Sequence, residues 1–398
     1  MQIKEKLPNM LYGLALVYFV LYFMKLLGFP DLLMLALGAF LCLGYLIVQK
    51  KIRLNAGLVF LTFTMFSYGM MIWGVKGAFI MLIYVPLVIC VLADYFGASI
   101  GRSQDKGKKL FAAAGTLVVG FSVHGLLNSY LYFAGYNETG RRFWMDIWTK
   151  MMTAGTQHAV YFLPLLAVLF PAVIYFSKRK VWNSLVILLG VFFCYTSLAT
   201  RSRMQLVILL LVCAIQFLLY IFMDKESFKK NLKDRRVQIM LAIALILAVV
   251  GFYFIKDSKI VTTFVENLGK GGGILHNVRF EAQAKVLSQL LDYPMGGRQM
   301  DIGRTYCHNV WLDMANAAGI IPFAGFTAYT VWSVCQAIQF VREKTISVDM
   351  KMMFVGLYAA FFLYFTVEPA LEASIHFITP WVFLNGLMHG YLSENNRH

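Results

Sequence analysis

Residues 204–223 read MQLVILLLVCAIQFLLYIFM, and no residue in this run carries a charge. A helix rises about 1.5 Å per residue, so a run of this length crosses the roughly 30 Å hydrocarbon core of a bilayer. Comparable apolar runs recur along the whole chain. The sequence therefore predicts a protein that crosses a membrane several times.

The composition agrees with this interpretation. Of the 398 residues, 60% are hydrophobic and only 14% are charged, whereas soluble proteins carry about 25% charged residues. The apolar runs seldom alternate with polar residues, which argues against a membrane β-barrel. The first run begins at Met10 and continues into further runs, so we expect it to remain as a span. We expect residues 1–398 to form a single all-α, polytopic integral membrane domain.

Run length predicts about twelve transmembrane helices. The expected spans are residues 10–27, 31–48, 56–73, 77–97, 110–134, 157–177, 182–199, 204–223, 238–255, 320–341, 352–367 and 375–394. The loops alternate in basic character, and the net charge is +16. The basic loops are QKKIR (49–53), GRSQDKGKK (101–109), SKRK (177–180), DKESFKKNLKDRR (224–236) and REK (342–344). These loops and both termini fall on one side, which the positive-inside rule makes cytoplasmic.

The opposite side carries two longer segments, residues 135–156 and 256–307. Loops as long as the second are usually functional or disordered. Together with the helix that follows it, this loop spans residues 256–319, and we expect it to be the extracytoplasmic catalytic part of the membrane domain.

Periodicity indicates that this loop is ordered. Within residues 277–291, Ala282, Val286 and Leu290 recur at helical spacing. A glycine-rich turn segment follows, and residues 308–318 resume a helix. We therefore expect amphipathic helices that form a cap on the membrane surface.

Arginines on the side of the cap depart from the charge rule, since positive charge there is not explained by topology. The candidates are Arg201, Arg203, Arg279, Arg298 and Arg304, with Arg141 and Arg142 in the other long loop. The planar guanidinium donates to phosphate and carboxylate in a fork, so this excess predicts an anionic ligand. Arg203 is the strongest candidate because it stands at the mouth of a span.

An ordinary explanation for these arginines stays open. Each could extend to lipid headgroups or pair with a carboxylate. The carboxylates within the same segments are Glu266, Glu281, Asp301, Glu368 and Glu372.

His308 lies directly before the helix at the end of the cap. Histidine titrates near neutral pH and is the commonest general base. The alternative for His308 is a loop residue that is hydrogen-bonded to a backbone carbonyl. His158, His276 and His376 are weaker candidates, and His124 and His389 are expected to be packing residues inside spans.

No metal or cofactor is predicted. Histidines and cysteines do not occur in pairs at ligand spacing. Of the six cysteines only Cys307 lies in a polar segment, so the sequence predicts no disulfide framework either.

Three motifs in this order resemble one known family. They are TRSR (200–203) before a span, NVRFEAQAKVLSQLLDYPMGG (277–297), and CHNVWLDMANAAGIIPFAGF (307–326). Over residues 195–340 the chain resembles the O-antigen ligases and the O-antigen or capsular polysaccharide polymerases. In that family an arginine begins a span, an "R…P-x-x-G" stretch lies in the large periplasmic loop, and an "H-N" motif ends that loop.

The resemblance implies a glycosyltransferase in a bacterial cytoplasmic (inner) membrane, with its site on the extracytoplasmic face. The donor would be a glycan linked to undecaprenyl diphosphate. Arg203 and Arg279 would contact the diphosphate and His308 would be the catalytic histidine. Arg201, Arg298 and Arg304 have no counterpart in the family and are included on charge alone. The expected reaction is metal-independent and inverting, with His308 as general base.

Other classes of function stay open. A polymerase joins two lipid-linked repeats, whereas a ligase transfers the glycan to a lipid-A core; the residues favour neither strongly, and we adopt polymerase. Membrane lipids and a chain-length regulator are further expected partners, and nucleic acid is not. A transporter of the same lipid-linked sugars would show repeated halves and polar groups at the bilayer midplane. A peptidoglycan-type glycosyltransferase would use an acidic residue such as Asp301.

Overall fold

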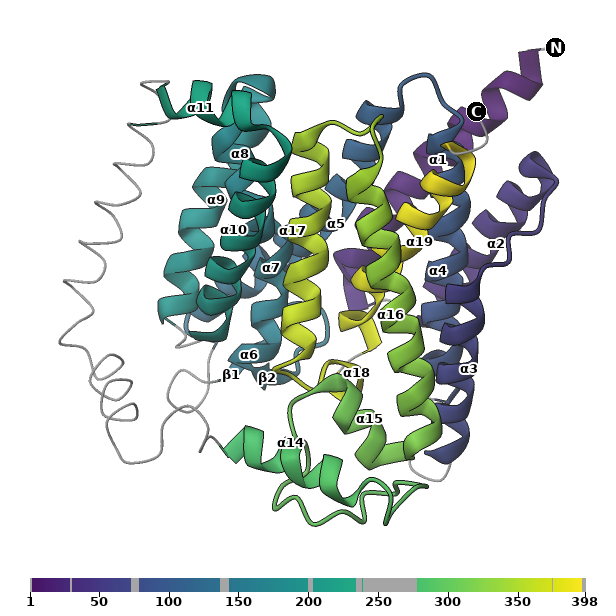
Figure 1. The fold of residues 1–398 in the computed structure, drawn as a ribbon, viewed down its shortest axis with the longest axis vertical. Coiled ribbons are helices and arrows are strands. Elements are labelled where there is room, and N and C mark those ends of the chain that lie inside the picture. Colours follow the sequence, from purple (N-terminus) through teal and green to yellow (C-terminus); the bar gives the residue numbers. More distant parts are fainter. Residues whose placement is uncertain are drawn as a thin grey trace.

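The computed structural model describes residues 2–28, 31–72, 79–136, 143–199, 203–233, 238, 278–373 and 375–395. It is mostly helical, and most of its helices lie side by side in one bundle (Figure 1). Within these residues seven helices are long and apolar enough to cross a membrane. Of the span predicted at 238–255, only residue 238 belongs to the described part. Residues 256–277 of the predicted loop also lie outside it.

The elements follow one another along the chain as shown in Figure 1. In the first half they are α1 (Gln2–Phe23), η1 (Leu26–Gly28), α2 (Asp31–Gln49), α3 (Ala56–Met71), α4 (Phe79–Gly101), α5 (Lys106–Phe133), β1 (Phe143–Met145), β2 (Met152–Ala154), α6 (Gly155–His158), η2 (Ala159–Phe162), α7 (Leu163–Ala167), α8 (Leu169–Ile174), η3 (Phe176–Lys178) and α9 (Lys180–Ala199). In the second half they are α10 (Arg203–Met223), α11 (Lys225–Lys233), α14 (Val278–Gln289), α15 (Val310–Ala318), α16 (Ile320–Arg342), α17 (Val348–Phe365), α18 (Ala370–Ala373), η5 (Ile375–Phe377) and α19 (Thr379–Asn395).

Glycines let α4 and α19 approach each other closely. A Cβ built on Gly97 would lie 2.2 Å from the carbonyl oxygen of Leu387, and one on Gly390 would lie 2.0 Å from that of Asp94. Small residues at such positions allow the backbones of two membrane helices to touch. Any larger residue at either glycine would push the two helices apart.

The span predicted at 157–177 is one of the seven that are long and apolar enough to cross a membrane, at Gly155–Ile174, but it consists of consecutive short helices and a 3₁₀ turn instead of one regular helix. α6, η2, α7 and α8 follow each other there almost without a break. Pro164 and Pro171 lie in α7 and α8, and each removes a backbone N–H that a continuous helix would use.

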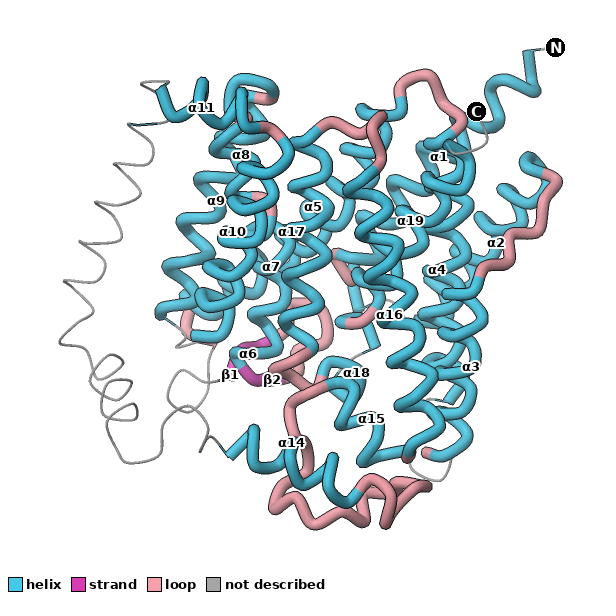
Figure 2. The backbone as a smooth tube through the Cα atoms, in the orientation of Figure 1, coloured by secondary structure: helices cyan, strands magenta, loops and turns pink. Residues whose placement is uncertain are grey.

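The prediction of a purely helical chain misses one antiparallel hairpin, formed by β1 and β2. Phe143 pairs with Ala154 and Met145 with Met152. Each strand has three residues, which is too short for an alternating pattern to stand out. The hairpin lies beside α6 (magenta in Figure 2).

The two ends of the bundle differ in character. α11, both termini and the turn from α4 to α5 lie at one end, whereas α14, α15 and the long loop between them lie at the other (Figures 1 and 2). The basic segments and the predicted cap are thus at opposite ends of the bundle.

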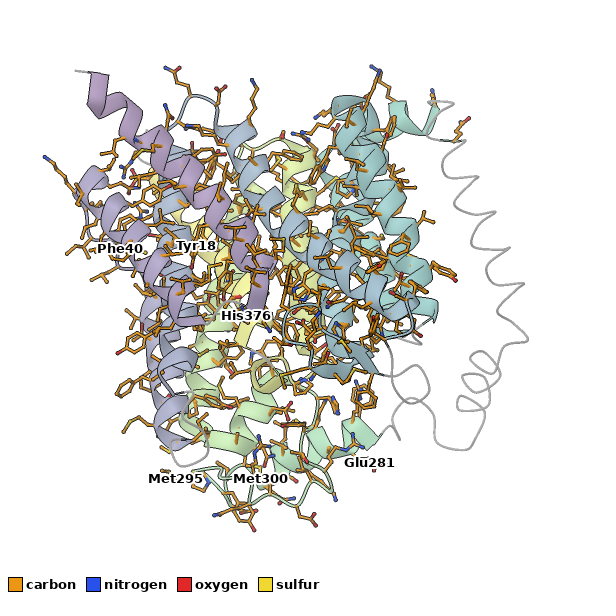
Figure 3. The ribbon with its side chains drawn as sticks, turned by 180° about the vertical axis from the view of Figure 1, so that it is seen from behind. Tyr18, Phe40, Glu281, Met295, Met300 and His376 are labelled. Atoms are coloured by element: carbon orange, nitrogen blue, oxygen red, sulfur yellow. The ribbon has the colours of Figure 1, made fainter. Side chains whose placement is uncertain are left out.

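The outer faces of the bundle carry many exposed apolar side chains. On α2, Phe40 is 71% exposed and points away from the bundle, whereas Tyr18 of α1 is buried (Figure 3). Exposed apolar area of this extent suits hydrocarbon rather than water. The described part therefore has the apolar outer surface of a membrane protein.

Candidate functional site

The stripe that the sequence predicts on the cap helix is buried in α14. Ala282 and Val286 are almost fully buried, and they pack with Leu290 against Met300 and Cys307 of the following segment. Met300 lies at the far end of the molecule together with Glu281 and Met295 (Figure 3). The cap therefore has a small apolar core of its own, which holds the loop in place.

A second apolar stripe on α14 faces outward. Phe280, Leu287 and, just past the end of the helix, Leu291 are exposed by 46%, 57% and 79%. Their spacing places them on one face, as residues seven and four apart lie on the same side of a helix. An amphipathic helix with such a face suits the interface between membrane and water.

Two glycines tie the cap segment to α15. Gly296 and Gly319 have φ of +69° and +87°, a backbone conformation that side chains disfavour. A Cβ on Gly319 would lie 2.1 Å from the carbonyl oxygen of Pro294. Only glycine fits at this contact, so the PMGG segment and the end of α15 are held together.

His308 has an unusual backbone conformation that Asp313 supports. Its φ is +59°, which is uncommon for a residue other than glycine. The Asp313 carboxylate accepts hydrogen bonds from the backbone N–H groups on either side, Cys307 at 2.7 Å and Asn309 at 3.1 Å. Burial raises the pKa of the Asp313 carboxyl, although these hydrogen bonds act in the opposite direction. The position of His308 is thereby set by its neighbours.

Three charged or titratable groups from separate segments meet at this end of the bundle. His308 Nδ1 lies 3.5 Å from Glu368 Oε2, and Arg279 Nη1 lies 3.6 Å from Glu368 Oε1. Arg279 Nη1 also donates to the carbonyl oxygen of Val367 at 2.7 Å. Glu368 follows α17, Arg279 begins α14, and His308 precedes α15. We call these three side chains the cap cluster.

The cap cluster is accessible and incompletely hydrogen-bonded. The side chains of His308 and Arg279 are 27% and 31% exposed, whereas that of Glu368 is only 5% exposed. Among the described residues, His308 Nδ1 and Glu368 Oε1 find no hydrogen-bond partner, and neither does the buried Nε of Arg304. Buried polar atoms normally have partners, so a polar ligand is a reasonable occupant.

The other arginines expected at the site are placed differently. Arg298 is exposed, donates from Nη1 to the carbonyl oxygen of Thr305 at 2.8 Å, and lies over the ring of Tyr306. Arg203 is the first residue of α10, and its side chain lies outside the described part, as does all of Arg201. The structure therefore places Arg279 and His308 beside the same carboxylate, that of Glu368. The role expected for Arg203 stays a prediction.

Glu368 and Asp313 were not recognised as site residues from the sequence. Glu368 was considered only as a pairing partner for an arginine, and that pairing is present in Arg279–Glu368. A carboxylate directly after an apolar run and before Pro369 was a signal that could have singled it out. The backbone-carbonyl hydrogen bond considered as the alternative for His308 is not made by its Nδ1.

Two other histidines, His124 and His158, are buried, whereas His376 and His389 are partly exposed. His124 is fully buried, as expected, and its Nε2 lies 2.8 Å from Asp146 Oδ2. His158 Nδ1 meets the side-chain amide of Asn128 at 2.9 Å. His389 differs from the expected packing residue, because its Nδ1 lies 2.6 Å from Asp94. His276 lies outside the described part.

Comparison of the sequence with models of protein families and with curated proteins gives no match. Within the described part no three His, Cys, Asp or Glu side chains gather to hold a metal ion. The cap cluster therefore offers an imidazole, a carboxylate and a guanidinium, which together can accept a proton and hold an anion.

Proposed function

We propose that this protein is a membrane glycosyltransferase that polymerises oligosaccharide repeats carried on undecaprenyl diphosphate. The observation that supports this most is the meeting of His308, Glu368 and Arg279 in one partly exposed cluster. In this proposal the protein has about twelve spans in a bacterial inner membrane. The cap, residues 256–319, faces away from the cytoplasm, because the basic loops lie at the other end.

The reaction is a single displacement at the anomeric carbon of the donor. The bond from this carbon to the diphosphate oxygen breaks, and a bond to the acceptor hydroxyl oxygen forms on the opposite face, so the configuration inverts. Negative charge grows on the leaving diphosphate. A fixed guanidinium stabilises that charge more in the transition state than in the ground state. Arg279 supplies it here, and Arg203 joins it as the family resemblance implies.

His308 takes the proton of the acceptor hydroxyl. Its Nδ1 faces Glu368, and a carboxylate at that nitrogen favours the N–H tautomer there, which leaves the lone pair on Nε2. Nε2 is then the base. The 3.5 Å separation is longer than a hydrogen bond, and such contacts commonly tighten when substrate binds.

The prenyl tail of the donor lies along the exposed apolar stripe of α14. With Phe280, Leu287 and Leu291 turned toward the membrane surface, the donor tail remains in hydrocarbon while its diphosphate reaches the cap cluster. The arginines supply positive charge that a metal ion provides in many other glycosyltransferases, so the reaction is metal-independent.

The test is a reaction of the purified protein in detergent with a synthetic prenyl-diphosphate oligosaccharide, followed by mass analysis. A ladder of products that differ by one repeat, unchanged by a chelator, supports a polymerase. Transfer only after a lipid-A core is added makes the protein a ligase. No transfer to either acceptor, with sugar movement across liposomes instead, overturns the proposal in favour of a transporter.

A further inference from the structure

A cavity of about 630 Å³, lined mainly by polar residues, lies among the ends of α1, α2, α4 and α5. The turn from α4 to α5 is at the end of the bundle opposite the cap (Figure 1). The volume of the cavity is in the usual range of ligand sites. The walls come from α1, α2, the end of α4, the turn that follows it and the start of α5. The lining residues that matter below are Tyr45, Gln49, Arg102, Ser103, Asp105 and Lys109. The proposed transferase reaction uses none of them.

Three buried polar atoms of the lining have no partner among the described residues. They are Tyr45 Oη, Gln49 Oε1 and Ser103 Oγ. Tyr45 is only 1% exposed, and its ring stacks near that of Tyr95. Buried hydroxyls in native proteins are almost always hydrogen-bonded. The cavity therefore offers two hydroxyl donors and one amide acceptor to a polar ligand.

The charge around the cavity favours an anion. Arg102 and Lys109 line it, against the one lining carboxylate, Asp105. Arg102 is also held by Glu394, with Nε 3.0 Å from Oε2. α5 begins at this point, and the Asp105 side chain does not cap its first N–H groups. The positive end of a long helix adds to the attraction for a negative group.

The helices that form the walls also carry exposed apolar side chains on their outer sides. Leu43 and Ile47 of α2 are exposed by 54% and 69%, and Met10 of α1 by 55%. Leu43 and Ile47 lie two residues from Tyr45 and Gln49, so they are on the opposite side of α2 from the cavity. Because this outer side suits hydrocarbon, lipid would lie along α2, next to the cavity.

We propose that this cavity binds a phosphate group, with the hydroxyls of Tyr45 and Ser103 and the ammonium of Lys109 as donors. The exposed apolar outer sides of α1 and α2 favour an anionic glycerophospholipid as the source of the phosphate, because they would keep lipid beside the cavity. Gln49 Oε1 then accepts a hydrogen bond from a hydroxyl of the head group. Free phosphate shares the same chemistry, and the experiment separates the two sources.

The experiment uses the full chain, purified in detergent and stripped of lipid. Thermal unfolding is followed while phosphatidylglycerol, phosphatidylcholine or inorganic phosphate is added. Phosphatidylglycerol is expected to raise the unfolding temperature saturably and phosphatidylcholine not to. Tyr45→Phe and Lys109→Gln each remove one donor, so each should weaken the apparent affinity at least about fivefold. The matched controls are Tyr130→Phe and Lys108→Gln, at exposed positions on α5 outside the lining, and these should bind as the parent does.

The outcomes are distinct. Saturable stabilisation by inorganic phosphate, weakened by the same two variants, supports the phosphate site with free phosphate as its source. Equal stabilisation by phosphatidylcholine, or parent-like affinity in both Tyr45→Phe and Lys109→Gln, overturns the proposal. If Tyr45→Phe does not fold, Lys109→Gln against Lys108→Gln decides alone.

Discussion

Two histidine–carboxylate pairs in this protein differ in how completely they are enclosed. His124 is fully buried, lies 2.8 Å from Asp146, and stacks on the ring of Tyr161. His308 lies 3.5 Å from Glu368 and its side chain is 27% exposed. The first pair has the geometry of a hydrogen bond, whereas the second does not.

The surroundings of the two carboxylates differ in the same way. Asp146 accepts further hydrogen bonds from the backbone N–H groups of Trp148 and Thr149. Glu368 Oε1 accepts none from the described residues. A carboxylate whose two oxygens both accept hydrogen bonds stabilises the fold, whereas one with an unpaired oxygen beside a partly exposed ring can take a substrate. We therefore propose that the cap cluster carries the chemistry and that His124–Asp146 is structural.

The largest effect is expected for His308→Asn. Asparagine tolerates the positive φ of this position better than alanine does, so the backbone is kept while the base is lost. We expect kcat/KM for glycan extension to fall by about 10²–10⁴-fold, with an unchanged unfolding temperature. Retention of half or more of the parent's activity would remove His308 from the mechanism.

A smaller effect on activity is expected for Glu368→Gln. Glutamine keeps the shape but not the charge that orients the imidazole, and we expect kcat to fall by about 10–100-fold with little change in KM. Glu368→Asp, which keeps the charge on a shorter side chain, should recover part of the loss. If Glu368→Gln lowers the unfolding temperature but not kcat, Glu368 is a structural residue only.

Asp146→Asn should affect stability instead of chemistry. Asparagine has one acceptor oxygen where Asp146 uses two, so either His124 or the backbone N–H groups lose their acceptor. This loss costs about 1–3 kcal/mol in the free energy of unfolding, while kcat/KM of the folded protein stays at the parent's value. A loss of activity without a loss of stability would reverse the roles assigned to the two pairs.

The loss of stability caused by Asp146→Asn should depend on pH. Burial raises the pKa of Asp146, but the hydrogen bond and charge of His124 outweigh burial and hold the pKa well below the ordinary value of 3.8. A carboxyl whose pKa is depressed by folding contributes stability above the unfolded pKa, and this is lost as pH falls through the folded pKa. The difference in unfolding temperature between parent and Asp146→Asn should be full at pH 7 and shrink as the pH falls below 3.8. A difference that is the same at all pH values would contradict this explanation.

Arg298→Gln should have the smallest effect. Arg298 is exposed and contacts Thr305 and Tyr306 rather than the cap cluster. We expect kcat/KM to change less than about threefold and the free energy of unfolding to stay within about 0.5 kcal/mol. A large loss in kcat/KM would show that the substrate extends across the glycine-rich segment.

The sequence predicted those features that depend on local pattern. Apolar runs mark the helices of the bundle, and the spacing of Ala282, Val286 and Leu290 marks the buried stripe of α14. His308 was proposed as the base from its residue type and position, and this role stays a prediction. These features follow from helical periodicity and from the chemistry of single side chains.

Features that depend on contacts between distant segments could not be predicted. Glu368 reaches His308 only because α17 ends beside the start of α15, and no periodicity records that meeting. Asp313 looks from the sequence like one more helical residue, although it fixes the backbone around His308. The pairing of His389 with Asp94 likewise depends on the close approach of α4 and α19.

The most direct test of the proposed role of the cap cluster is a double-mutant cycle on glycan extension with the parent, His308→Asn, Glu368→Gln and the double variant. If Glu368 acts by positioning His308, the double variant should be no slower than His308→Asn alone. Once the imidazole is gone, removing the carboxylate that orients it has no further effect on the rate. If the rate losses of the two single variants multiply in the double variant, the account is wrong. It is also wrong if the parent protein extends no glycan.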